Sequence, residues 1–164
     1  MQHNQTTTDT TTSSRDPLGQ HNCVLCNSAG GKIIWENTSL RVIDAADAQY
    51  PALTRVIWQA HVREMTDLDP SARAEMMDAV WTVEKVMRQV LRPDKINLAS
   101  LGNVVAHVHW HVIPRFQDDA HFPDAIWAAP KRASVPRLSE ECVADYHRQL
   151  CNALLLNGTA TRHC

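Results

Sequence analysis

Three histidines at alternate positions are the residues of this sequence best suited to chemistry. His107, His109 and His111 lie in the run VVAHVHWHVIP over residues 104–114. Side chains alternate between the two faces of a β-strand, whereas they turn by 100° per residue in a helix. A strand therefore places all three imidazoles on one face, about 6.6 Å from one to the next. The apolar residues between them would pack into a core on the opposite face.

Two kinds of chemistry suit such a row of imidazoles. Burial of three imidazoles costs free energy unless each has a partner, so a purely structural role explains the pattern poorly. Histidine is a common zinc ligand, and three of them can leave one coordination position open for catalysis. A neutral imidazole is also a nucleophile near pH 7, and its neighbours could stabilise the charge of a phosphate. The spacing alone does not decide between a metal site and a nucleophile.

The strands that position this row follow from runs of β-branched and apolar residues bounded by turn signals. We predict five strands, over residues 32–35, 39–44, 54–60, 95–101 and 104–114. The first two form a hairpin that follows a turn at Gly30-Gly31, and the last two form a second hairpin around Gly102-Asn103. The histidines then lie on the last strand.

Two helices are predicted beside these strands. The first begins after Asp69, has proline at its first position, and repeats its apolar residues at steps of three and four until Pro93. The second begins after Ser139, which is suited to cap it, and ends at Asn157-Gly158. The connection before this second helix is rich in proline and irregular.

The bulk composition limits the class of protein. A chain of 164 residues is the usual size of one domain. A net charge of -2 leaves no basic excess for a nucleic-acid polymer as partner. No run of about 18 apolar residues could span a membrane, and the start of the chain lacks the apolar core of a secretory signal. Five cysteines, of which only Cys23 and Cys26 are close together, indicate a reducing compartment. We therefore predict a cytoplasmic protein with no membrane partner.

The histidine row resembles the signature of the histidine triad (HIT) family of nucleotide hydrolases and transferases. That signature is His-φ-His-φ-His-φ-φ with φ apolar, and the run from His107 to Ile113 matches it at every position. The resemblance covers roughly residues 22–118. It implies an α+β, HIT-like fold, in which helices flank an antiparallel sheet of about five strands. It also implies a homodimer with one continuous sheet.

The predicted division of the chain follows from the resemblance and from local composition. Residues 1–19, which include TTTDTTTSS, form a disordered polar tail. Residues 20–158 form a single HIT-like domain, whose C-terminal loop and helix cover 119–158. Residues 159–164 form a second tail.

The resemblance assigns a role to each histidine of the row. His109 is the nucleophile that attacks an α-phosphorus and forms a nucleotidyl-histidine, which water or another acceptor then cleaves. His111 binds phosphate oxygens or assists the leaving group, and His107 orients the nucleophile or ligates a metal. The substrate is then a small nucleotide, either a nucleoside phosphoramidate or a dinucleoside polyphosphate, and no organic cofactor is implied.

Three polar residues match substrate-binding positions of the family. Asp44 matches an acidic residue that meets ribose hydroxyls, and Asn97 and Asn103 match polar positions near the phosphates. Purely structural roles are open as well. Asp44 could cap a turn, and Asn103 could simply follow Gly102 in a tight hairpin.

Four residues match the ligands of a structural zinc found in many bacterial members of the family. These are Cys23, Cys26, His61 and the first histidine of the row, His107. A closed Cys₂His₂ shell would stabilise the fold and take no part in catalysis. The Cys-x-x-Cys pair by itself could also be a redox pair.

The sequence departs from the family at two positions that concern the leaving group. Leu53 replaces a histidine that many relatives carry, and Gln59 replaces a lysine. These changes leave two alternatives open beside the enzyme: a nucleotide-binding or adaptor protein with little turnover, and a three-histidine metalloenzyme. Trp127, in the region where relatives differ, fits a core position as well as it fits a substrate contact.

Overall fold

The computed structural model describes residues 22–135 and 137–157 of the chain. Its sheet has five antiparallel strands in the order β1-β2-β3-β5-β4. Their bounds are Lys32–Glu36 (β1), Leu40–Asp44 (β2), Thr54–Trp58 (β3), Lys95–Ala99 (β4) and His109–Arg115 (β5). The predicted α+β fold is therefore confirmed. The two predicted tails and Gly158 lie outside the described residues.

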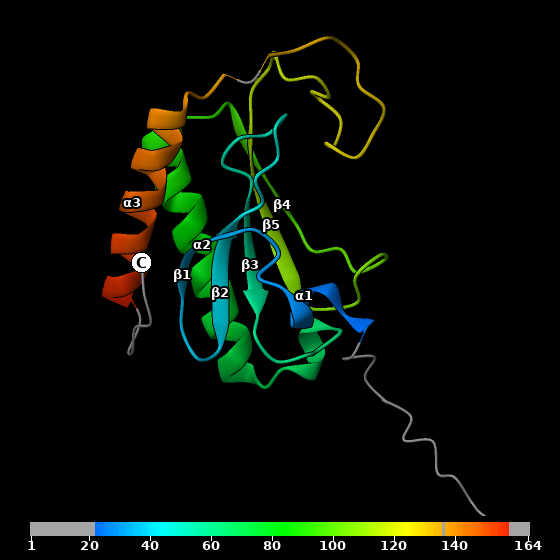
Figure 1. Ribbon diagram of the computed structural model, residues 1–164, viewed down its shortest axis with the longest axis vertical. Helices are drawn as coiled ribbons and strands as arrows, with labels where there is room; N and C mark the ends of the chain where they lie inside the picture. The colour runs from blue at the N-terminus through cyan, green and yellow to red at the C-terminus, as the bar shows by residue number, and fades with distance from the viewer. Residues whose placement is uncertain (1–21, 136, 158–164) are drawn as a thin grey trace, which may run out of the picture.

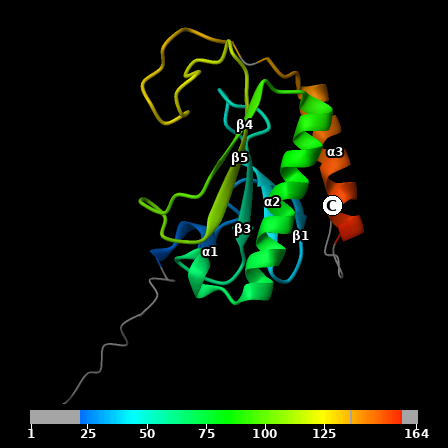
Figure 2. The same cartoon turned by 180° about the vertical axis from the view of Figure 1, so that it is seen from behind.

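Two long helices lie side by side along one face of the sheet (Figures 1 and 2). They are α2 (Pro70–Leu91) and α3 (Glu140–Asn157). A short helix, α1 (Val24–Asn27), and a 3₁₀ helix, η2 (Met65–Asp67), precede them in the chain. Both predicted N-caps are present: the Asp69 side chain accepts from the backbone N–H groups of Ser71 and Ala72, and Ser139 Oγ accepts from that of Cys142. Within the described residues, no helix is both long and apolar enough to cross a bilayer.

The two faces of the sheet have different neighbours. Val42, Val56 and Val112 belong to the main core, together with apolar residues of α2 and α3. Strand alternation places Ile43 and Ile57 on the other face, where they pack with Cys23 and Leu25 at α1. One face is thus filled by long helices, and the other is left to a short helix and to loops.

A glycine pair brings α1 and its cysteines against that second face. Gly30 has a φ of 82°, a conformation that glycine adopts without strain. At Gly31 a Cβ atom would lie 2.1 Å from the backbone oxygen of Asp44, so no other residue fits without moving β2. The turn predicted at Gly30-Gly31 is confirmed, and it fixes the position of α1.

The last hairpin differs from the prediction. β5 begins at His109 and β4 ends at Ala99, so residues 100–108 connect them in place of a tight turn at Gly102-Asn103. The reason lies in the backbone before β5: the N–H of His107 donates to the carbonyl of Val105, and that of Val108 to the carbonyl of Val62. These bonds take the chain away from β4. β3 is also shorter than predicted, ending at Trp58.

Candidate active site and metal cluster

His109 and His111 form a pair of imidazoles on β5, which we call the imidazole pair. Both side chains are buried, and their ring centroids lie 4.9 Å apart. The alternation predicted from the sequence is present, because Val108 and Val112 belong to the core on the helix side. The pair therefore faces away from α2 and α3.

A hydrogen bond fixes the orientation of the His109 ring. Its Nδ1 lies 2.6 Å from the carbonyl oxygen of His107. A carbonyl only accepts, so Nδ1 carries the proton and donates it. The other nitrogen, Nε2, then keeps its lone pair. His109 has the tautomer that a nucleophile requires.

The site keeps the imidazole pair neutral. Burial lowers the pKa of His109, although its bond to the His107 carbonyl acts in the opposite direction. Burial, followed by electrostatic interactions with His109 and Arg55, lowers the pKa of His111 to about 4. Both rings are therefore uncharged at pH 7, and a neutral imidazole is the reactive form.

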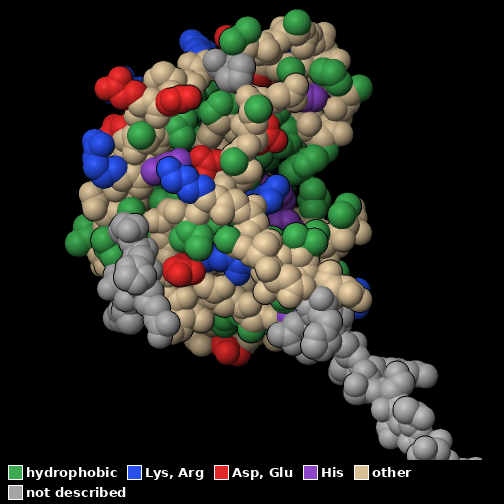
Figure 3. Space-filling model, in the orientation of Figure 1, with side chains coloured by type: hydrophobic (Ala, Val, Ile, Leu, Met, Phe, Trp, Pro, Cys, Tyr) green, Lys and Arg blue, Asp and Glu red, His purple; other side chains and the backbone are tan. Residues whose placement is uncertain are grey.

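The surroundings of His111 differ from those of His109. Its Nδ1 is buried and has no hydrogen-bond partner among the described residues. The ring of Trp127 lies edge-on to it, with centroids 5.3 Å apart, and Arg55 is its partner across the β3–β5 ladder. In the space-filling view, histidine side chains and a basic side chain lie together in a hollow of this face (Figure 3).

The first histidine of the row points to a different site. His107 lies two residues before β5, and its Nδ1 is 3.4 Å from Cys23 Sγ and 3.5 Å from Cys26 Sγ. Cys26 Sγ is also 3.2 Å from His61 Nδ1. The donor atoms of these four residues all lie within 4.8 Å of one another. We call them the Cys/His cluster.

The geometry of the Cys/His cluster fits a metal ion. A tetrahedral zinc shell places its donor atoms roughly 3.3–3.8 Å apart. The three Sγ–Nδ1 separations of 3.2, 3.4 and 3.5 Å are close to this range. The Nε2 of His107 lies 2.7 Å from the carbonyl oxygen of Trp58, so it carries the proton and leaves Nδ1 free to face the sulfurs. Metal-ligating histidines commonly make such a bond through their other nitrogen. The cluster could therefore hold a metal ion with all four predicted ligands.

The three predicted substrate-binding residues lie in different places. Asn97 is opposite Ile113 in the β4–β5 ladder, on the face that carries the imidazole pair. Asp44 pairs with Thr54, a residue on the helix side, and its Oδ2 lies 2.9 Å from His147 Nε2 on α3. Asn97 on β4 accepts a hydrogen bond of 2.6 Å from Arg115. Asn103 is exposed in the connection between β4 and β5. The carboxylate of Asp44 thus points to the opposite face of the sheet.

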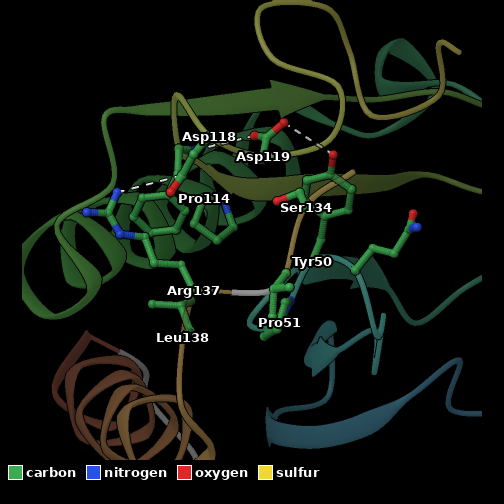
Figure 4. A pocket seen from close by; sticks show the side chains of 11 residues that line it. Tyr50, Pro51, Pro114, Asp118, Asp119, Ser134, Arg137 and Leu138 are labelled. Carbon is green, nitrogen blue, oxygen red and sulfur yellow. Dashed lines mark hydrogen bonds and ion pairs between the residues drawn. The ribbon is translucent and has the colours of Figure 1, made fainter. Parts of the chain in front are cut away.

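A buried polar network holds the loop that carries Trp127. Arg115, at the end of β5, donates two hydrogen bonds to Asp119, of 2.7 and 3.0 Å. The hydroxyl of Tyr50 lies 3.4 Å from the same carboxylate (Figure 4). The same hydroxyl contacts His121. The neighbouring pocket has a cavity volume of about 20 Å³, too small for a nucleotide. The network therefore positions the loop.

Sequence reasoning missed three contributors to the site. Arg55 could have been found, since it is a lone charge in the apolar run TRVIW. The carbonyl of Trp58 has no signal in the sequence, because backbone groups are common to all residues. The Tyr50–Asp119 contact joins residues 69 positions apart, so it has no signal in the sequence either.

Comparison with known proteins leads to the same family as the histidine row. The model of one family, described as the HIT domain, matches residues 28–118. A curated relative from Schizosaccharomyces pombe, bis(5'-nucleosyl)-tetraphosphatase [asymmetrical], is 30% identical over 83 residues. That match covers 48% of this chain and 46% of the relative, so the chain spans about half the length of the relative that it matches.

Solved structures share the fold. A histidine triad protein from Marinobacter aquaeolei is 25% identical, with a TM-score of 0.62 over 78% of this chain and 91% of the other. One from Bradyrhizobium japonicum is 24% identical, with the same TM-score over 74% and 88%. A Zn-bound histidine triad family protein from Mycobacterium smegmatis is 22% identical, with a TM-score of 0.56 over 85% and 97%.

Proposed function

The chain belongs to the HIT domain family, and from this premise we propose that it is a nucleotide hydrolase or transferase that works through His109. The substrate is a nucleoside phosphoramidate or a dinucleoside polyphosphate, attacked at the α-phosphorus. The observation that carries the proposal is the hydrogen bond from His109 Nδ1 to the carbonyl of His107. It holds the ring with Nε2 free, and the lowered pKa keeps that nitrogen unprotonated.

The reaction proceeds in two displacements. In the first, the lone pair of His109 Nε2 forms a bond to the α-phosphorus while the bond to the leaving group breaks, and the leaving group keeps that electron pair. A polyphosphate leaves as its anion, whereas an amine takes up a proton from solvent as it leaves. In the second, the oxygen of water or another acceptor attacks the phosphorus and the P–N bond breaks, with its electron pair returning to His109 Nε2. The proton of the acceptor passes to solvent. Covalent catalysis divides one difficult displacement into two easier ones.

The remaining polar residues support the substrate in different ways. His111, whose buried Nδ1 lacks a partner among the described residues, contacts the phosphate or the leaving group beside His109. Asn103 is exposed and stays our candidate for a phosphate contact. Asp44 and Asn97 are engaged with His147 and Arg115, so their contacts to ribose and phosphate would require those partners to be released.

We further propose that the Cys/His cluster holds a structural zinc. Two thiolates and two imidazoles are a donor set that zinc prefers, and the Zn-bound relative from Mycobacterium smegmatis shares the fold. Bound there, the ion would link α1, the segment after β3 and the start of β5. It would also hold His107, whose carbonyl orients the nucleophile. The catalytic steps above do not pass through the metal.

The assembly and location follow the resemblance. We propose a cytoplasmic homodimer that takes small nucleotides as its partners. The sheet ends at β4, where Leu98 and the nearby Leu101 are 37% and 44% exposed, so a second copy could extend the sheet there. Light scattering on the purified protein would give the mass of the assembly, and a monomeric mass would contradict the homodimer.

A covalent intermediate is the sharpest test of the enzymatic proposal. Intact-protein mass spectrometry follows wild type and His109→Gly after mixing with adenosine phosphoramidate or a dinucleoside tetraphosphate, while chromatography follows the release of AMP. We expect a nucleotide-sized adduct and AMP with wild type only. Turnover that survives in His109→Gly would refute the assignment.

Two other classes of function would give different results. A nucleotide-binding adaptor, favoured by the buried Leu53 where relatives carry a histidine, would bind nucleotide without adduct or product. A three-histidine metalloenzyme would lose activity on chelation while its fold survived. The structure disfavours the latter, because His107 Nδ1 faces the cysteines while His109 pairs with His111.

A further inference from the structure

Arg55 stands on the face of the sheet that carries the imidazole pair. It lies directly opposite His111 in the β3–β5 ladder. Opposite residues in antiparallel strands share a face, with Cβ atoms about 4.5–5.5 Å apart. Its neighbours on this face are Leu53, just before β3, and Ile57, and both are buried and apolar. Arg55 is therefore a single charge in an otherwise apolar row.

The guanidinium of Arg55 lacks the partners that a half-buried cation usually has. Its Nε is buried without a hydrogen-bond partner among the described residues. None of the ion pairs in the described part of the chain includes it. Burial lowers its pKa, and Asp47 opposes this only by its charge, without an ion pair. Burying an unpaired charge costs stability, so this position is better explained by an anionic ligand.

The position of Arg55 in the β3–β5 ladder indicates which anion it meets. It adjoins His111 and lies farther from the Cys/His cluster than Ile57, which is opposite His109. Its planar fork matches the oxygens of a phosphate group. We propose that Arg55 binds the phosphate group that leaves when His109 attacks. The enzyme then favours substrates whose leaving group is a polyphosphate over those whose leaving group is an amine.

The charges of the site agree with this assignment, which rests on the proposed function. When the P–O bond breaks, its electron pair stays on the leaving oxygen, where negative charge grows. The other ladder partners of the imidazole pair, Ile57 and Ala99, are apolar and cannot balance that charge. Arg55 is permanently charged. It also places a cation two residues from Leu53, the position at which many relatives carry a histidine.

The kinetic test compares two leaving groups. Values of kcat/KM are measured for a dinucleoside tetraphosphate and for adenosine phosphoramidate with wild type, Arg55→Met and Arg55→Lys. Arg88→Met, an exposed position on α2, is the matched control. We expect Arg55→Met to lose about 100-fold on the tetraphosphate, as when one donor to a developing oxyanion is removed, and less than ~3-fold on the phosphoramidate. Arg55→Lys should recover part of the loss. Equal losses on both substrates, or none, would overturn the inference.

A binding test separates this inference from the proposed function. Titration calorimetry measures the Kd of the tetraphosphate and of AMP in the His109→Gly background, with and without Arg55→Met. We expect the tetraphosphate to bind about 10-fold more weakly when Arg55 is lost, and AMP to bind unchanged. Unchanged tetraphosphate binding would show the inference to be wrong even if His109 is the nucleophile. A wild-type protein that forms no adduct would sink the enzymatic proposal, while the Kd comparison would still decide the role of Arg55.

Discussion

The Cys/His cluster and the imidazole pair lie next to each other but surround a histidine side chain in opposite ways. In the cluster, His107 Nδ1 faces two sulfurs and its Nε2 is bonded to the carbonyl of Trp58. In the pair, His109 uses Nδ1 for a carbonyl and leaves Nε2 without a protein ligand. One arrangement directs a nitrogen into a closed set of possible donors, and the other leaves a nitrogen without a protein ligand, as a nucleophile requires.

The difference shows that neighbours, more than spacing, decide what each histidine does. His107 lies before the strand, where the chain bends toward α1, and the next two histidines lie within β5. The two sites are nevertheless joined through one residue. The side chain of His107 belongs to the cluster, and its carbonyl orients His109.

The largest expected effect separates the two sites by activity. His109→Gly should lower kcat by at least ~10³-fold, because the nucleophile itself is removed. The metal content and the thermal midpoint should stay near those of wild type, since the ring is not a ligand of the cluster. Steady-state kinetics, elemental analysis and a thermal melt measure the three quantities. Loss of the metal in this variant would contradict the separation.

The next largest effect distinguishes the Cys/His cluster from the imidazole pair by the stability of the protein. Cys23→Ser removes a thiolate ligand, so bound zinc no longer favours the folded state. We expect a loss of roughly 3 kcal/mol or more in the free energy of unfolding and a midpoint about 10 °C lower. Elemental analysis and thermal unfolding check this. Cys142→Ser, on α3 and outside the cluster, is the matched control and should keep its metal. Equal midpoints for the two variants would argue against a structural metal.

The pH dependence of stability tests the surroundings of the imidazole pair. The unfolded chain protonates His111 near its ordinary pKa of 6.5, whereas the folded site lowers that pKa to about 4. Between these values the unfolded chain binds more protons, so the contribution present above pH 6.5 is lost as the pH falls toward 4. It amounts to at most ~3 kcal/mol.

Chemical denaturation of wild type and His111→Asn over this range isolates the effect. Protonation of the Cys/His cluster is common to both proteins and cancels in the difference between them. The free energy of unfolding should fall more steeply for wild type. Parallel curves would mean that His111 is not held neutral by the fold.

The smallest expected effect concerns the loop above His111. Trp127 is 51% exposed and contacts His111, so Trp127→Ala should raise KM about 10-fold through a lost aromatic contact with the substrate. Metal content and the thermal midpoint should change little. Trp81→Ala, at a similarly exposed tryptophan on α2, is the control. An unchanged KM would assign Trp127 a packing role.

Local patterns were enough to predict much of the fold. The helix beginning after Asp69 followed from its cap and its apolar period, and the alternation of His109 with Val108 and Trp110 predicted the face of the imidazole pair. The start of β5 could not be predicted in this way. It depends on a bond from Val108 to the carbonyl of Val62, whereas the nearby glycine and asparagine indicate a tight turn.

The substrate-binding residues were less predictable for a related reason. The two residues before Asp44, Val42 and Ile43, point to opposite faces of the sheet and are both apolar. The pattern therefore does not tell which face receives Asp44. Its partner, His147, is supplied by a helix about a hundred residues later. Asn97 likewise depends on Arg115, whose side chain is fixed by the loop that follows it.

The double use of His107 constrains how this chain can vary. A change at Cys23, Cys26 or His61 removes one proposed ligand but also loosens residue 107, and with it the carbonyl that sets the tautomer of His109, our proposed nucleophile. Such a change is tolerated only after other contacts hold that peptide in place. Across lineages, the four ligands should therefore appear or disappear as a set, and intermediates with three of them should be rare.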